Sequence, residues 1–179
     1  MPAAGHGRVH VFDVENHVGT PVYVHAKVCV VDDIWVSVGS DNFNRRSWTH
    51  DSELSSVVLD TTRDPREPQD PTGTGEGARV FARDLRLELA REHLDLPADG
   101  SDDGELLDPE RFVTALNRSA QALEDWHDGG RRGPRPPGRL RPHRPEQLSP
   151  ATRLWATPVY WLLEDPDGRP LRKRLRREF

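Results

Sequence analysis

The chain has 179 residues, a formal net charge of −5 and a hydrophobic fraction of only 34%. Its 16 prolines and 14 glycines indicate that part of the chain packs a core and the rest forms loops or an extension. The negative net charge argues against binding of a polyanion by the whole chain, although local patches can differ. The single cysteine, Cys29, excludes an internal disulfide and a cysteine-based zinc site.

The start of the chain gives one candidate strand and no targeting signal. Residues 1–7 lack the charged start and the apolar run of a signal peptide, and no stretch of the chain is long enough to span a bilayer. We therefore expect a cytoplasmic protein or one at the membrane periphery. Residues 8–14 alternate between polar and apolar side chains, which predicts a strand.

The stretch from Tyr23 to Asn42 predicts a β-hairpin. Residues 23–31 are rich in β-branched side chains and read as a buried strand. Asp32 and Asp33 are typical turn residues, and residues 34–38 return as a second strand. Gly39 allows a sharp turn of the backbone at the end of that strand.

The polar residues of this stretch predict an anion site. Side chains alternate across a strand, so His25 and Lys27 are expected on the same face. Ser40 and Asn42 follow the second strand and can reach the same place. Together they offer hydrogen-bond donors for a tetrahedral oxyanion, of which phosphate is the leading candidate, and none of them demands a metal. His25 can attack phosphorus or move a proton near neutral pH.

At this point the residues resemble a known signature. The pattern H-x-K-x4-D-x6-G-S-x-N is similar to that of the phospholipase D superfamily, and it is filled here by His25, Lys27, Asp32, Gly39, Ser40 and Asn42. The resemblance implies cleavage of a phosphodiester without metal or cofactor, in two displacements through a phosphohistidine. It implies that Lys27, Ser40 and Asn42 hold the non-bridging oxygens. In members with two copies of the motif the C-terminal histidine is the general acid and base, and His25 would take that role.

The resemblance also implies an acidic partner for the catalytic histidine. In the family this residue precedes the next strand, which the sequence predicts at residues 56–59. It fixes the histidine tautomer through a hydrogen bond. Glu53 is the first candidate and Asp51 the second, because spacing alone does not separate them.

Only one copy of the motif is present, so this sequence departs from the two-copy pattern. One copy supplies half of an active site. Either a missing N-terminal half carries the other copy, or two chains pair symmetrically, as single-motif nucleases of the superfamily do. We favour the missing half, because a single candidate strand before the hairpin buries too little apolar surface. The hypothesis is that Met1 lies within a longer protein.

A second element favours a phospholipase. A helix is predicted over residues 78–94 from apolar residues at helical spacing. Within it, residues 85–94 are similar to an L-R-x-x-L-x-x-E-H-L element near the C-terminus of the larger, eukaryotic-type phospholipases D. This resemblance implies a glycerophospholipid substrate. The alternatives are a homodimeric single-motif nuclease and a catalytically inactive fragment that only binds partners or membrane.

The predicted fold is α/β, with half of a phospholipase D-type mixed sheet covered by helices and a C-terminal extension. The half-domain is assigned to residues 1–96 and the extension to residues 97–179. A helix is predicted over residues 109–128, because Asp108 can cap it, Pro109 suits its first position and Gly129 can end it.

The rest of the extension is basic and rich in proline or aromatic residues. Residues 131–150 are assigned to a basic, proline-rich linker, in which residues 131–144 are predicted to be extended and not folded. The tail carries Trp155, Tyr160 and Trp161 and closes with a basic run over residues 172–177. These basic segments suit peripheral contact with an anionic membrane. A packed segment with a solvated tail is the alternative.

Overall fold

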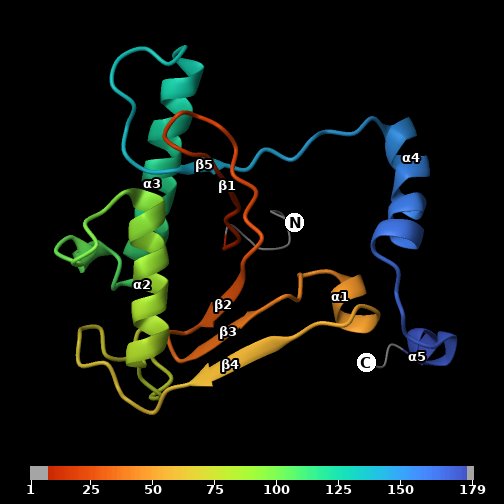
Figure 1. The fold of residues 1–179 in the computed structure, drawn as a ribbon, viewed down its shortest axis with the longest axis horizontal. Helices are drawn as coiled ribbons and strands as arrows, with labels where there is room; N and C mark the ends of the chain where they lie inside the picture. The colour runs from red at the N-terminus through yellow and green to blue at the C-terminus, as the bar shows by residue number, and fades with distance from the viewer. Residues whose placement is uncertain (1–7, 177–179) are drawn as a thin grey trace. The chain divides into compact units, whose positions relative to one another are not determined.

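A computed structural model describes residues 8–176 (Figure 1). The first seven residues of the predicted half-domain and Arg177, the last residue of the predicted basic run, lie outside the described part. The described chain contains both helices and sheets, which is compatible with the α/β class. None of the helices within residues 8–176 is both long and apolar enough to cross a membrane.

The chain divides into two compact units, and each is described by itself. Of the described residues, the first unit comprises 8–25, 30–36 and 58–144, and the second comprises 26–29, 37–57 and 145–176. The units do not divide at residue 96. The predicted division into a half-domain and an extension concerns family relationship and stays a prediction.

The predicted hairpin is present in a three-stranded sheet of order β2-β3-β4 (Figure 1). The strands are β2 (Lys27–Val31), β3 (Trp35–Gly39) and β4 (Ser55–Leu59). A three-residue turn joins β2 to β3, and the Ile34 N–H donates to the Val31 carbonyl at 2.9 Å. The predicted start of the first strand at Tyr23 is wrong, because residues 23–26 are exposed and take no part in the ladder.

A second, two-stranded sheet lies in the first unit. Strand β1 (Phe12–Val14) pairs antiparallel with β5 (Leu140–Pro142), and Asp13 lies opposite Arg141. Of the predicted strand over residues 8–14, only the last three residues form one. The prediction that residues 131–144 are not folded is wrong at β5, which pairs with β1. Strands β1 and β5 are far apart in the chain, and the composition of a proline-rich segment does not reveal that it pairs with a distant strand.

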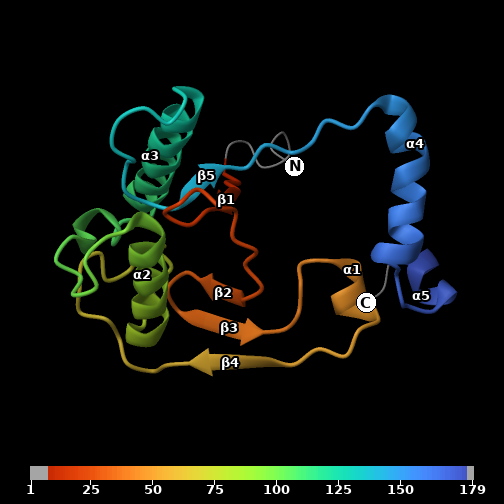
Figure 2. The same ribbon diagram turned by 45° about the horizontal axis from the view of Figure 1, so that its top comes forward.

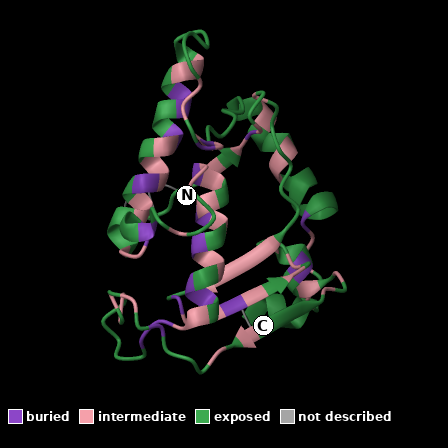
Figure 3. Ribbon diagram, turned by 60° about the vertical axis from the view of Figure 1, so that its left-hand side comes forward, coloured by how far each residue is buried: buried purple, intermediate pink, exposed green. Residues whose placement is uncertain are grey.

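Two helices carry the core of the first unit. Helix α2 (Val80–Leu94) begins two residues after the predicted start, and α3 (Pro109–Asp128) has the predicted bounds. The Asp108 carboxylate caps α3 by accepting hydrogen bonds from the N–H groups of Glu110 and Arg111, at 3.0 and 2.9 Å. A short 3₁₀ turn, η1 (Asp103–Glu105), lies between these helices, and the buried core cluster consists of Leu87, Ala90, Leu94, Leu106 and Ala115. Buried positions along the chain are purple in Figure 3.

A buried ion cluster ties the hairpin turn to α2. Asp33 is buried and accepts hydrogen bonds from Arg83 Nε at 3.1 Å and from Arg86 Nε at 2.6 Å. Burial alone would raise the pKa of Asp33, but the hydrogen bonds and charges of Arg86 and Arg83 outweigh it and hold that pKa below its ordinary value. Arg83 also donates to the backbone carbonyls of Arg66 and Pro68, which fixes the long loop before α2.

The second unit contains short helices that follow β3 or close the chain. They are α1 (Arg45–Thr49), α4 (Pro150–Val159), a π-helical turn η2 (Tyr160–Glu164) and α5 (Leu171–Arg176), of which the α-helices are labelled in Figure 2. Buried Asp165 joins the two parts of this unit. Its carboxylate accepts from the Arg46 N–H at 2.7 Å, and its carbonyl accepts from Arg45 Nη2 at 2.7 Å.

We expect Arg83→Met to lower the free energy of unfolding by about 3 kcal/mol, because it removes one partner of a buried ion pair and leaves two carbonyls without their donor. Denaturant unfolding of the full chain measures this loss. Arg118→Met is the matched control, since Arg118 pairs with Glu105 at the exposed surface and its loss should change stability little. Equal effects of the two variants would contradict a structural role for the Asp33 cluster.

Candidate active site

Ser40 links the end of β3 to the start of β4 in the second unit. Its N–H donates to the Leu54 carbonyl at 3.0 Å, and its hydroxyl oxygen accepts from the Leu54 N–H at 3.0 Å. The hydroxyl then donates to Glu53 Oε2 at 2.5 Å. Three hydrogen bonds therefore fix Ser40 and present the Glu53 carboxylate beside it.

Gly39 makes this close approach possible. A Cβ atom at Gly39 would lie 2.7 Å from the Leu54 carbonyl oxygen and closer still to the Ser55 hydroxyl. No side chain fits between the two strands at this point. The glycine of the motif therefore allows the backbones of β3 and β4 to meet where Ser40 and Glu53 form their hydrogen bond.

Glu53 is held as a carboxylate. The hydrogen bond from Ser40 is the largest cause that lowers the pKa of Glu53, followed by the Ser47 hydroxyl. Desolvation and the charge of Asp51 oppose the shift, whereas the charge of Lys27 adds to it. Lys27, Ser40 and Glu53 are thus three predicted site residues that the second unit brings together.

The two candidate acids have different partners. Asp51 Oδ1 accepts from Arg46 Nε at 2.8 Å, whereas Glu53 is bound to Ser40. Asp51 is therefore engaged in an ion pair on α1. This geometry favours Glu53 over Asp51 as the acid of the site, and its contact with a catalytic histidine stays a prediction.

Asn42 is placed by the first turn of α1. Its N–H donates to the hydroxyl of buried Ser47 at 3.1 Å. The N–H of Ser47 donates in turn to the Asn44 side chain at 2.8 Å, which caps the helix. Asn42 itself is exposed at the end of this short segment.

His25 and Asp32 lie in the first unit. His25 is exposed, and its ring centroid lies 5.8 Å from that of Tyr23 with the planes tilted by 33°. Asp32 is exposed in the hairpin turn with φ of 58°. Because His25 and Lys27 fall in different compact units, their grouping stays a prediction from the sequence.

Asp33 is a residue whose importance the sequence did not reveal. The sequence offers two adjacent aspartates, and the motif assigns a role to Asp32 alone. The structure buries Asp33 against two arginines of α2 and leaves Asp32 exposed. Those arginines come much later in the chain, so no local pattern distinguishes the two acids.

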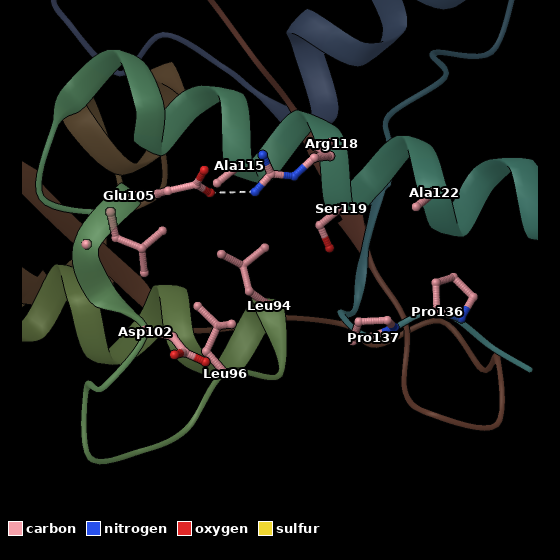
Figure 4. Close-up of a pocket in the computed structure, with 12 residues that line it drawn as sticks. Leu94, Leu96, Asp102, Glu105, Ala115, Arg118, Ser119, Ala122, Pro136 and Pro137 are labelled. Atoms are coloured by element: carbon pink, nitrogen blue, oxygen red, sulfur yellow. Dashed lines mark hydrogen bonds and ion pairs between the residues drawn. The ribbon is translucent and has the colours of Figure 1, made fainter.

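The first unit also contains an open pocket, and the residues that line it are distant in sequence from the predicted site residues. It has a volume of about 540 Å³ and is formed by the end of α2, the η1 turn and α3 (Figure 4). Leu94, Leu106 and Ala115 form its apolar wall, and the exposed Glu105–Arg118 ion pair lies at its edge. None of the predicted site residues lines it. Within residues 8–176, no group of three or more histidine, cysteine or acidic side chains is arranged to hold a metal ion.

Fold and site together define an α/β protein with ionic and hydroxyl side chains gathered at the ends of neighbouring strands. Comparison with known proteins identifies the family that part of this chain resembles. Residues 3–64 match the family described as "Cardiolipin synthase, PLD-like domain". This part of the chain is similar to phospholipase D-like domains.

Individual relatives agree with this assignment. The chain is 42% identical over 90 residues to phospholipase D1 of Schizosaccharomyces pombe and 40% identical over 104 residues to phospholipase D1 of Mus musculus. It is 38% identical over 91 residues to phospholipase D zeta 1 of Arabidopsis thaliana. These alignments cover 48%, 57% and 49% of this chain but only 6%, 9% and 8% of the relatives. The chain therefore spans less than a tenth of their length.

We expect Gly39→Ala to destabilise the chain by about 1–3 kcal/mol, because the added methyl group overlaps the Leu54 carbonyl and the Ser55 side chain. Thermal unfolding measures the loss, and amide chemical shifts of Ser40 and Leu54 report the local displacement. Gly104→Ala is the control, since a Cβ atom there meets nothing within 4 Å. An unchanged Ser40 amide in Gly39→Ala would contradict the proposed packing of β3 on β4.

Proposed function

We propose that the chain supplies one half of a phospholipase D-type active site that acts on glycerophospholipids. The observation that carries the proposal is the Ser40–Glu53 hydrogen bond beside the charge of Lys27, at positions of the superfamily motif. Support comes from the family match over residues 3–64 and from relatives named phospholipase D. Glycerophospholipid as the substrate class, hydrolysis or transphosphatidylation as the reaction, and His25 as a catalytic residue are parts of this proposal.

In the proposed reaction a histidine of the second motif copy attacks phosphorus, and the bond from phosphorus to the headgroup alcohol breaks. His25 donates its proton to the leaving alkoxide. It then takes a proton from water or another alcohol, whose oxygen attacks the phosphohistidine and releases the phosphatidyl product. Lys27 and Asn42 bind the non-bridging oxygens as negative charge develops on them.

The hydrogen bonds of Ser40 favour a different role from the phosphate binding that the family resemblance implies. The Ser40 hydroxyl proton points to Glu53, and its oxygen accepts from Leu54. In this arrangement Ser40 positions the Glu53 carboxylate, and it donates to a phosphate oxygen only after the hydroxyl rotates. Glu53 in turn is proposed to fix the tautomer of a catalytic histidine. Asp32, the aspartate of the motif, lies in the hairpin turn.

The second half of the site is proposed to come from another polypeptide segment that carries a further copy of the motif. Exposure of the sheet supports a partner, because Val36 is the one hydrophobic side chain of β2–β4 that is buried, and Val31, Val38, Val57 and Leu59 are exposed. A sheet of three strands normally needs a covered apolar face for stability. A second copy of this chain is the alternative partner and is distinguished by oligomeric state.

We expect the purified chain to be a monomer with little or no turnover of phosphatidylcholine vesicles or bis-nitrophenyl phosphate, because it holds one copy of the motif. Light scattering gives the mass and phosphate-ester assays give the rate. An active monomer whose activity is abolished by His25→Ala would overturn the half-site proposal. An active dimer that cleaves DNA would establish the nuclease in its place.

We expect inorganic phosphate to bind near Lys27 and to shift the amide resonances of Ser40 and Leu54. Lys27→Met should weaken this binding about tenfold, since a hydrogen bond to a charged group contributes ~1.5–3 kcal/mol. Lys173→Met is the matched control, because Lys27 and Lys173 are the two lysines of the chain. Equal weakening in both variants would show a nonspecific charge effect and would remove the support for a phosphate site.

A further inference from the structure

The helices near the C-terminus present an apolar surface. Segment α4–η2 spans residues 150–164, and neither element contains a buried residue. Leu154 and Trp155 are 80% and 63% exposed, and Val159, Tyr160, Trp161, Leu162 and Leu163 are also exposed. Between residues 150 and 163, Arg153 is the one charged side chain. A surface with so many large apolar side chains marks an interaction site.

A basic segment follows this apolar surface. Helix α5 reads Leu171-Arg-Lys-Arg-Leu-Arg176, with four basic residues and no acid. Its two leucines are exposed, at 70% for Leu171 and 78% for Leu175. Tryptophan and tyrosine next to arginine and lysine favour a lipid headgroup layer, where aromatic rings lie at the boundary and basic residues meet anionic lipids. The charge of α5 is therefore complementary to an anionic bilayer.

The apolar segment and the turn that follows it are attached to α1 by specific contacts. The Arg45 guanidinium lies 5.5 Å from the centre of the Trp161 ring, and Arg45 and Arg46 both bind Asp165. The Gly168 N–H donates to the Thr49 hydroxyl at 2.8 Å. Helix α1 begins three residues after Asn42, so the surface belongs to the same unit as the candidate phosphate ligands.

The other basic segment is engaged inside the first unit. Arg135 binds buried Glu15 at 3.1 Å, and Arg141 Nε binds buried Glu124 at 2.8 Å. Arg139 and Arg144 also pair with acids, Asp95 and Glu124. These arginines stabilise β5 and α3 and have their charges matched by carboxylates. The basic proline-rich segment is therefore a poor candidate for attraction to a membrane.

We propose that residues 148–176 form a peripheral membrane-binding surface for anionic phospholipid bilayers. The apolar side chains of α4–η2 insert at the level of the headgroups, and α5 contacts the anionic lipids. Because α4–η2 is only 15 residues long and is followed by charges, it lies in the interface and does not cross the bilayer. This surface extends the proposed function, since it brings the chain to its lipid substrate, but it does not depend on catalysis.

The test is co-sedimentation of the full chain with vesicles of phosphatidylcholine alone and of phosphatidylcholine with phosphatidylserine. We expect binding to the mixed vesicles and much weaker binding to the neutral ones. Leu154→Ala with Trp155→Ala should reduce binding at least about tenfold, since each lost side chain removes buried apolar area. Arg172→Gln with Lys173→Gln should reduce binding to the mixed vesicles by about tenfold or more, at up to ~1 kcal/mol per basic residue.

Arg131→Gln with Arg132→Gln is the matched charge control, because it removes two exposed charges from the proline-rich segment. It should leave vesicle binding unchanged. Circular dichroism and the unfolding midpoint establish that each variant folds. The proposal is overturned if the chain does not bind anionic vesicles. It is also overturned if the control variant loses binding as strongly as the α5 variant, or if Leu154 and Trp155 mediate self-association in place of vesicle binding. Lys27→Met should bind vesicles normally, so a failed phosphate site and a failed membrane surface give different results.

Discussion

The buried carboxylate of Asp33 is the contact on which the first unit depends. It fixes the turn between β2 and β3 by binding Arg83 and Arg86 of α2. Arg86 is also the arginine of the L-R-x-x-L element, so the two sequence patterns that resemble the superfamily meet at one ion cluster. A buried carboxylate without its arginines would be strongly destabilising. The helical element and the motif hairpin are therefore held together by one ion cluster, even though they are far apart in the sequence.

The second unit relies on hydrogen bonds and a close backbone contact more than on a core. Gly39 permits the approach of β3 to β4, and Ser40 then joins the two strands through Leu54 and Glu53. No residue of α4, η2 or α5 is buried. A unit with so little apolar burial of its own gains stability when another surface covers it. Both proposed partners, the second half of the site and the membrane, supply such a surface.

Local signals allowed much of the fold to be predicted from the sequence. Helix α3 was predicted with its observed bounds because Asp108, Pro109 and Gly129 act within one turn of its ends. The hairpin was predicted because alternation and turn residues are also local. The failures involve long-range pairing: residues 23–26 have high strand propensity but lack a partner, and β5 pairs with β1 from a segment whose composition indicates a linker. Propensity without a neighbouring strand does not make a ladder.

The sequence predicts the residues of the candidate site, and this stays a prediction, but it does not predict the hydrogen bonds that distinguish Ser40 from Asn42. The motif gives Ser40 and Asn42 one shared task, whereas the structure gives Ser40 a proton donation to Glu53 and gives Asn42 an exposed place before α1. A serine whose proton is already directed to a carboxylate is better suited to orient that carboxylate than to bind phosphate. In the proposed site, Lys27 and Asn42 are therefore the donors assigned to phosphate, and Glu53 is the acid assigned to a histidine. The structure thus shows a series of hydrogen bonds from the Leu54 N–H to the Ser40 hydroxyl and from that hydroxyl to the Glu53 carboxylate, and this series positions the carboxylate.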